Sequence, residues 1–127
     1  FGNGSNNMLS SSPGTIFWLG GGNNVRASDT SQANYSIASS SIALTANTWY
    51  NAVVTYNSLA TTATWKIYIN GQLDTITYAD SSPPLRGIQV GAFGSGNFFS
   101  GQLALPMIYN RALTTDEILQ NYNYCIF

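Results

Sequence analysis

The sequence predicts an antiparallel β-sandwich that ends in one short helix. Three observations predict it: many short runs of β-branched and aromatic residues between turn signals, an Asn-Gly pair joining two such runs, and a single helical pattern near the C-terminal end. Short strands in this arrangement, without alternating helices, are typical of a sandwich rather than of an α/β sheet.

The Asn-Gly pair at Asn70-Gly71 is the strongest local signal. A type I′ hairpin turn needs a positive φ at both central residues, and Asn followed by Gly meets that need. Alternation along the preceding run predicts that Ile67 and Ile69 point to one side of the strand and Tyr68 to the other. A hairpin is therefore expected at the centre of the domain.

The other elements are expected on both sides of this hairpin. Residues 1–14 are dense in Gly, Asn and Ser, which predicts a flexible arm or loop, with the sandwich domain over residues 15–127. Pro106 donates no ladder hydrogen bond, so it must lie at a bulge or an edge of the last strand. The expected strands are residues 15–19, 25–28, 35–38, 41–44, 48–57, 64–70, 72–78, 87–93 and 98–110.

The helix is expected over residues 114–122. Thr114 and Glu117 have the spacing of a capping box, in which each side chain bonds the other residue's backbone N–H. The apolar stripe of this helix is Ile118, Leu119 and Tyr122.

The composition limits the classes of partner. Only 7% of the residues are charged, against about 25% in an average soluble domain. Four basic residues scattered singly, with a net charge of −1, give no electrostatic footprint for nucleic acid or for an anionic membrane. No apolar run is long enough for membrane insertion. A polar but nearly uncharged surface suits an extracellular or close-packed setting.

The residues needed for common catalytic chemistry are missing from the sequence. The chain has no histidine, which removes the Ser-His-Asp triad and ordinary zinc sites. Glu117 is the single glutamate, and no strand carries the paired carboxylates of a glycoside hydrolase. Cys125 is the single cysteine, so an internal disulfide is excluded and a small, partly buried residue is expected. We predict no catalytic residue, no metal ligand and no enzymatic activity.

Several segments together carry a family resemblance. In this order and spacing they resemble the concanavalin A-like lectin/glucanase superfamily, in its laminin-G-like branch of the phage or secreted bacterial type. The resemblance covers residues 44–123 and implies a jelly-roll sandwich over residues 15–127. The matching segments are WYNAVVTY (residues 49–56), IYING (67–71), Gly91, FSG (99–101) with Leu103, IYNRAL (108–113) and TTDEILQNYN (114–123).

The chain departs from this family in two places. Such domains usually carry additional N-terminal strands, so a longer chain or a neighbouring subunit is expected to cover an open sheet edge. Leu105 and Met107 stand where the family tends to have charged residues in its final strand. The resulting apolar stripe makes Leu105 and Met107 the candidate partner contacts. The alternative is a core strand in a different register.

Two functions remain open. The first is a non-enzymatic surface or assembly module: a virion protein (capsid decoration or tail) or a cell-surface structural and adhesion protein, located outside the cell or on the virion and bound to other structural subunits. The alternative is a glycan-binding module of a larger secreted protein. Its ligand-binding residues stay unassigned. Aromatic side chains for a sugar platform, and amides to hydrogen-bond beside it, are available at Trp18, Tyr35, Tyr68, Tyr78, Phe98, Asn23, Asn24 and Asn97.

No cofactor is predicted for either function. Some laminin-G-like domains hold calcium at the rim of the sandwich, which keeps a calcium ion as an alternative. Calcium prefers six to eight oxygen ligands, usually with several carboxylates. Asp29 and Asp80 are the only aspartates expected in loops outside the helix, and nothing in the sequence brings them together.

Overall fold

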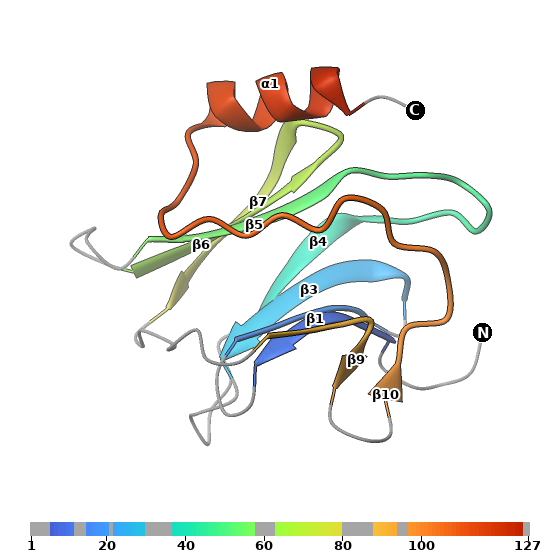
Figure 1. Cartoon of the computed structure of the whole chain (residues 1–127). Coiled ribbons are helices and arrows are strands. Elements are labelled where there is room, and N and C mark those ends of the chain that lie inside the picture. The colour runs from blue at the N-terminus through green and yellow to red at the C-terminus, as the bar shows by residue number, and fades with distance from the viewer. Residues whose placement is uncertain are drawn as a thin grey trace.

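Figure 1 shows the computed structural model of the chain, which describes residues 6–11, 15–20, 22–29, 37–57, 63–79, 88–93 and 97–125. Strands form most of the regular structure in these ranges, and the helix comes last. The elements are β1 (Asn6–Ser11), β2 (Thr15–Leu19), β3 (Asn24–Asp29), β4 (Ile37–Ala43), β5 (Ala52–Asn57), β6 (Ala63–Ile69), β7 (Gln72–Ala79), β8 (Ile88–Val90), β9 (Ala92–Phe93), β10 (Asn97–Phe98) and α1 (Thr115–Tyr124).

The strands form two main sheets and one small ribbon. The larger sheet has the order β4-β3-β2-β1-β8, the smaller one has the order β5-β6-β7, and β9 pairs with β10. Every pairing between described strands is antiparallel. The predicted antiparallel sandwich with one C-terminal helix is therefore confirmed.

The hydrophobic core lies between the two main sheets. Strands β3 and β4 bury small side chains, and β6 buries large ones against them. The ring of Tyr56 on β5 packs against the ring of Trp65 on β6, with centroids 4.8 Å apart. The buried members of this core are Val25, Ala27, Ala38, Trp65, Ile67 and Ile69.

The β6–β7 hairpin has the predicted turn. Asn70 has φ 52° and Gly71 has φ 76°, the two positive values that a type I′ turn requires. Ile67 and Ile69 lie in the core between the sheets, as predicted. Tyr68 points to the opposite face, where it is only 1% exposed.

A second, smaller core covers that opposite face of the three-stranded sheet. Tyr68 packs there with Val53 from β5, with Leu113 from the segment before α1 and with Ile118 from α1. Figure 1 shows α1 lying across the end of the β6–β7 hairpin, reached by the segment of residues 99–114 that runs from β10 across the sheet. The helix keeps its predicted capping box at Thr114 and runs two residues past its predicted end.

The N-terminal segment differs from its prediction. Residues 6–11, expected to belong to a flexible arm or loop, form β1 and pair with β2 on one side and β8 on the other. Strand formation depends on neighbouring strands more than on intrinsic preference, so a run rich in Asn and Ser was a weak guide. Residues 1–5 and 12–14 lie outside the described residues.

The first half of the chain contains two further corrections. Where two short strands are expected at 35–38 and 41–44, one strand, β4, runs from Ile37 to Ala43 with Ser40 inside it, and residues 35 and 36 lie outside the described residues. The buried Ser40 hydroxyl accepts a hydrogen bond from the Val25 backbone N–H at 2.9 Å and donates to the Ile42 carbonyl at 2.7 Å. The strand expected at 48–57 begins only at residue 52, since a turn at Ala46-Asn47 precedes it.

The last two predicted strands are shorter than expected. Gly91, with φ 78°, separates β8 from β9 and interrupts the strand expected at 87–93. The strand expected at 98–110 ends at Phe98, and no strand or helix follows until α1. Leu105 has φ 48°, which leaves the extended region, and Pro106 has no N–H to offer a ladder. The prediction of a long final strand was therefore wrong.

Candidate functional site

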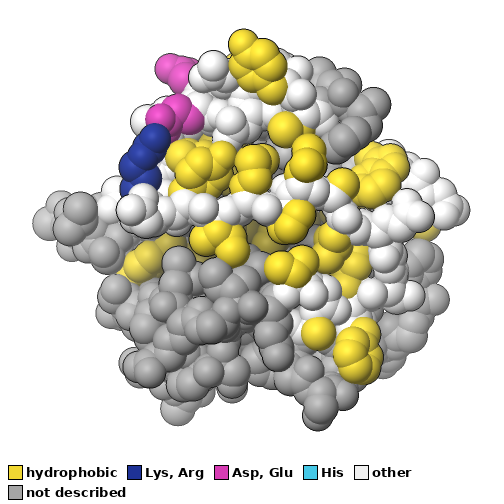
Figure 2. Space-filling view, viewed as in Figure 1, with side chains coloured by type: hydrophobic (Ala, Val, Ile, Leu, Met, Phe, Trp, Pro, Cys, Tyr) yellow, Lys and Arg dark blue, Asp and Glu magenta, His cyan; other side chains and the backbone are white. Residues whose placement is uncertain are grey.

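The segment of residues 99–114 carries a row of large apolar side chains on the surface. We call these five residues, Leu103, Leu105, Met107, Ile108 and Tyr109, the apolar strip. Their exposed fractions run from 40% at Leu103 to 56% at Leu105. Figure 2 shows hydrophobic side chains gathered in a band across this face, with the charged side chains at one edge of it.

Leu105 has a backbone conformation that a leucine rarely adopts. Its φ of 48° lies in the left-handed region, where an L-residue with a Cβ is disfavoured by about 1–2 kcal/mol. The side chain is also more than half exposed, so the core gains little from it. Neither the local backbone nor the packing of the described residues explains a leucine at this position.

Polar contacts fix the C-terminal end of the apolar strip to α1. The Tyr109 hydroxyl accepts a hydrogen bond from the Asn121 side-chain amide at 3.1 Å and donates to the Met107 sulfur at 3.5 Å. Arg111 makes two bonds of 2.7 Å to the carboxylate of Glu117. These contacts hold the strip in one place relative to the helix.

The same carboxylate belongs to the helix cap. Glu117 accepts a bond from the Thr114 backbone N–H at 2.8 Å, and the Thr114 hydroxyl accepts one from the Glu117 backbone N–H at 3.3 Å. The bond from Arg111, helped by the Thr114 N–H, lowers the pKa of Glu117 to about 2. The single glutamate of the chain is therefore a structural residue.

A cavity of about 510 Å³ lies at one rim of the sandwich. We call it the rim cavity; residues 44–50, which precede β5, and residues 99–102, which follow β10, line it together with Leu19 and Asn23. Its volume is within the range of about 300–1,000 Å³ that small-molecule sites occupy.

Hydrogen bonds hold the loops around the rim cavity. The Leu44 N–H donates to the Asn23 carbonyl at 2.8 Å, and the Phe99 N–H donates to the Gly91 carbonyl at the same distance. The Tyr50 hydroxyl accepts from the Thr45 N–H at 3.3 Å. Bonds from the Thr45 side chain and backbone lower the pKa of the Tyr50 phenol below its usual value.

The lining of the rim cavity combines aromatic and uncharged polar groups. The Trp49 side chain is 55% exposed at its edge, while Tyr50 is partly buried against the core between the sheets. Amides come from Asn23, Asn47 and Gln102, and hydroxyls from neighbouring Thr and Ser residues. No lining residue carries a carboxylate, an ammonium or a guanidinium group.

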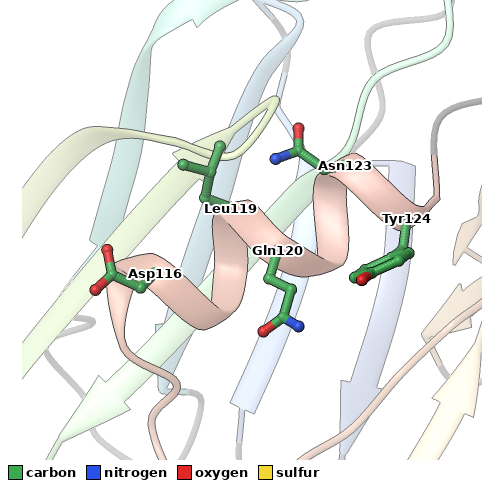
Figure 3. Close-up of a pocket in the computed structure, with 5 residues that line it drawn as sticks. All are labelled: Asp116, Leu119, Gln120, Asn123 and Tyr124. Carbon is green, nitrogen blue, oxygen red and sulfur yellow. The ribbon is translucent and has the colours of Figure 1, made fainter.

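A shallower hollow of about 360 Å³ lies on the outer side of α1. Figure 3 shows its five side chains, all of them from this one helix. Within the part of the chain that the structure describes, no second element contributes to this lining, so the hollow has no opposite wall there. Its residues are Asp116, Leu119, Gln120, Asn123 and Tyr124.

A second carboxylate among the described residues, that of Asp74, links the two main sheets. Asp74 on β7 accepts bonds from the Ser41 backbone N–H at 2.7 Å and from the Ser41 hydroxyl at 2.6 Å. Burial raises the pKa of Asp74, but the bonds from Ser41 and Thr75 outweigh it, so the pKa lies below its usual value. Within the described ranges, no three His, Cys, Asp or Glu side chains gather at a metal-binding distance. The described part of the chain also contains no helix long and apolar enough to span a bilayer.

The residues that the sequence predicts for a site differ in their exposure. Leu105 and Met107 are both exposed, and their contact with a partner stays a prediction. Tyr68, one of the candidate glycan-binding aromatics, is buried beneath α1. Cys125 is partly buried at the helix end, as predicted.

Of the other glycan-binding candidates, Phe98 is exposed on β10 and Trp18 is half-buried on β2. Asn23 lines the rim cavity, whereas Asn24 donates its amide to the Ser40 carbonyl. Tyr35 and Asp80 lie outside the described residues, as do the side chains of Tyr78, Asn97 and Asp29. The calcium alternative therefore falls on side chains that the structure does not describe.

Trp49, Asn47 and Gln102 line one cavity that the sequence does not predict. The sequence predicts a strand at Trp49 and another at Gln102, but both residues lie in loops. The sequence signal for this loop was Asn47, because asparagine directly before a strand-like run is typical of a turn. The structure has a turn there, with φ 58° at Asn47. A turn there leaves Trp49 outside the strand.

A family model agrees with this fold. The family model described as the concanavalin A-like lectin/glucanases superfamily, laminin G type, matches residues 2–119. Among solved structures, the chain is similar to an S-layer domain-containing protein from Clostridium thermocellum, with 17% identity and a TM-score of 0.44. The match covers 95% of this chain and 64% of the length of that one. No curated protein matches.

Proposed function

The chain belongs to the concanavalin A-like lectin/glucanase superfamily, in its laminin-G-like family, and we propose that it is a non-enzymatic surface or assembly module. In this proposal it works as a structural and adhesion protein, on a virion as a capsid decoration or tail component, or on a cell surface. Its partners are other structural subunits, which it meets outside the cell or on the virion.

The apolar strip is the observation that carries this proposal. Large apolar side chains grouped on one surface favour contact with another protein, because association removes them from water. The five side chains of the strip lie within seven residues of one segment, and the charged groups of that face lie at its edge. Such a surface supports a lasting contact better than a transient, charge-steered one.

The conformation of Leu105 supports the same proposal. Unfavourable backbone conformations persist where the surroundings hold them, and they are concentrated at functional sites. An exposed leucine with φ 48° costs the isolated chain free energy and returns little packing. Contact with a partner gives that side chain a role.

The environment of two described carboxylates, Glu117 and Asp74, supports a non-enzymatic role. Glu117 is engaged by Arg111 and the helix cap, and Asp74 by Ser41. Both are held in their ionised form by structural bonds, which leaves neither as an acid or base poised near neutral pH.

The substitution Leu105→Asn separates assembly from folding. Asparagine tolerates a positive φ, so the free energy of unfolding of the isolated chain should stay the same or rise by up to about 1 kcal/mol. Incorporation of the chain into its native particle or surface layer, measured as stoichiometry by quantitative mass spectrometry, should fall. Ile42→Thr, which removes an exposed apolar side chain from β4, is the control and should leave incorporation unchanged. Full incorporation of Leu105→Asn would contradict the proposal.

The second candidate function is that of a glycan-binding module, and the rim cavity is the observation that favours it. Sugar-binding sites need an aromatic surface with amide and hydroxyl groups beside it, and the cavity lining contains all three. Binding of the whole chain to an array of surface glycans tests this function without reference to any one site. The two functions are compatible, since the apolar strip and the rim cavity share no residue.

A further inference from the structure

We propose that Met107 is an oxidation site, and that its conversion to the sulfoxide by hydrogen peroxide prevents the apolar strip from binding a partner. Tyr109 is the residue that holds the sulfoxide oxygen. This inference rests on the first proposed function, partner contact through the apolar strip, and adds a means by which that contact is regulated.

Met107 lies in the middle of the apolar strip and is accessible in the free chain. Its side chain is 48% exposed, with Leu105 and Tyr109 two residues away on either side. A dissolved oxidant must reach the sulfur from solvent, so an exposed methionine is a favoured target. Met107 is therefore open to oxidation until a partner covers the strip.

The reaction transfers one oxygen atom. A lone pair of the Met107 sulfur attacks one oxygen of hydrogen peroxide, the O–O bond breaks, and the departing hydroxide takes the proton of the transferred oxygen and leaves as water. The sulfur loses two electrons and the peroxide gains them. The product is a sulfoxide, which is polar and chiral where the thioether was apolar.

A fixed hydroxyl group distinguishes Met107 from a methionine that is merely exposed. The Tyr109 hydroxyl donates to the Met107 sulfur at 3.5 Å, and the Asn121 side-chain amide on α1 donates to that hydroxyl at 3.1 Å. A thioether sulfur is a weak acceptor, whereas a sulfoxide oxygen is a strong one. The Tyr109 hydroxyl can therefore hold the new oxygen on one side of the sulfur, which favours one of the two sulfoxide epimers.

The oxidised strip loses affinity for an apolar partner surface. A partner that covers Leu105 and Ile108 must also remove water from the sulfoxide oxygen between them. Tyr109 offers this oxygen fewer hydrogen bonds than water does, so its desolvation is not fully compensated. A bound partner in turn shields Met107 from peroxide. Oxidation and partner contact therefore exclude one another.

The oxidation step is tested on the whole chain in dilute solution, without a partner. Hydrogen peroxide should convert Met107 to the sulfoxide, which peptide mass spectrometry maps. Methionine sulfoxide reductases A and B each repair one epimer, so the fraction that each enzyme restores gives the epimer ratio. We expect an excess of one epimer of at least about threefold, and about equal amounts in Tyr109→Phe, which removes the hydroxyl and keeps the strip apolar.

The effect on assembly is tested by incorporation of the oxidised chain into its native particle or surface layer. Incorporation should fall at least about tenfold and should return after treatment with both reductases. Met8→Leu, which removes the other methionine of the chain, should be as sensitive to peroxide as the wild type. Met107→Leu is the control: whatever its starting level, its incorporation should be the same before and after peroxide. Met107→Gln introduces a polar side chain there without an oxidant and should reduce incorporation.

The outcomes separate this inference from the function on which it rests. If the sulfoxide form incorporates normally while Leu105→Asn does not, the inference is overturned and the apolar strip stands as the contact surface. Full incorporation of both would overturn the proposed function as well. Peroxide that modifies Met8 and leaves Met107 unchanged would contradict the site. An epimer ratio that is the same in Tyr109→Phe would contradict the role of Tyr109.

Discussion

The contact between the hairpin turn and α1 allows a controlled test of how the helix is held. In Gly71→Ala, the new Cβ would meet Tyr122 Cδ1 at 3.0 Å, Tyr122 Cβ at 3.1 Å and Leu119 Cδ1 at 3.2 Å. All three distances are shorter than ordinary van der Waals contact. The Tyr122 Cβ is attached to the helix backbone, so rotation of the side chain cannot remove that contact, and the helix itself must shift.

The expected cost has two parts. Alanine at φ 76° is disfavoured by about 1–2 kcal/mol relative to glycine. Overpacking against α1 adds about 1–3 kcal/mol. The free energy of unfolding should therefore fall by about 2–5 kcal/mol in Gly71→Ala, measured by urea denaturation with the slope of the transition as a check on two-state behaviour.

Gly91→Ala is the matched control for the backbone part. Gly91 has φ 78°, nearly the same value, but among the described residues a Cβ there meets only Leu103 Cδ1 at 3.9 Å, an ordinary contact. Its cost should be about 1–2 kcal/mol, from the backbone alone. If Gly71→Ala costs no more than Gly91→Ala, the helix does not rest on the hairpin turn and the reasoning is refuted.

Three further predictions concern the polar contacts. Because folding lowers the pKa of Glu117 from 4.5 to about 2, its stabilising effect is complete above pH 4.5 and is lost as the pH falls through about 2. Glu117→Gln should remove that part of the acid dependence in pH-dependent melting, and an unchanged profile would argue against it. Thr114→Ala should cost about 1 kcal/mol by urea denaturation, with Thr114→Ser close to wild type, since serine is an equally good cap. Asp74→Asn should cost about 1 kcal/mol by the same assay through its weakened bonds to Ser41, and a neutral effect would show that this link contributes nothing.

The sequence was a good guide wherever one local rule decided the structure. The hairpin at Asn70-Gly71 follows from the φ values that its turn demands, and the helix start follows from the spacing of Thr114 and Glu117. Alternation along β6 correctly separated Ile67 and Ile69 from Tyr68. These features needed no knowledge of distant parts of the chain.

Prediction failed where distant contacts decided. Residues 6–11 look like a loop by composition, but strands on both sides supply their hydrogen-bond partners. Ser40 lies in a Ser-rich run that resembles a turn, although its hydroxyl bonds to β3 and keeps the strand continuous. Residues 99–110 have strand-like composition, but the backbone at Leu105 leaves the extended region.

The two candidate sites differ in the same way, since one depends on local sequence and the other on contacts between distant segments. The apolar strip was predictable in part, because Leu105 and Met107 stand where the family resemblance implies charged residues. The rim cavity was not predictable, because residues 44–50 and 99–102 are far apart in the sequence and meet only through the fold. The predicted strand also begins four residues before β5 does, so the sequence places Trp49 in a strand instead of in the loop where it lies.

Solvent protection of Met107 tests the proposed assembly role most directly. Met107 is about half exposed in the isolated chain, so hydroxyl-radical footprinting should oxidise it readily there. In the intact particle or cell surface that carries the chain, we predict strong protection of Met107 and Leu105, with Tyr124, which is 81% exposed, as an internal reference. Equal oxidation of Met107 in both settings would contradict the claim that the apolar strip contacts a partner.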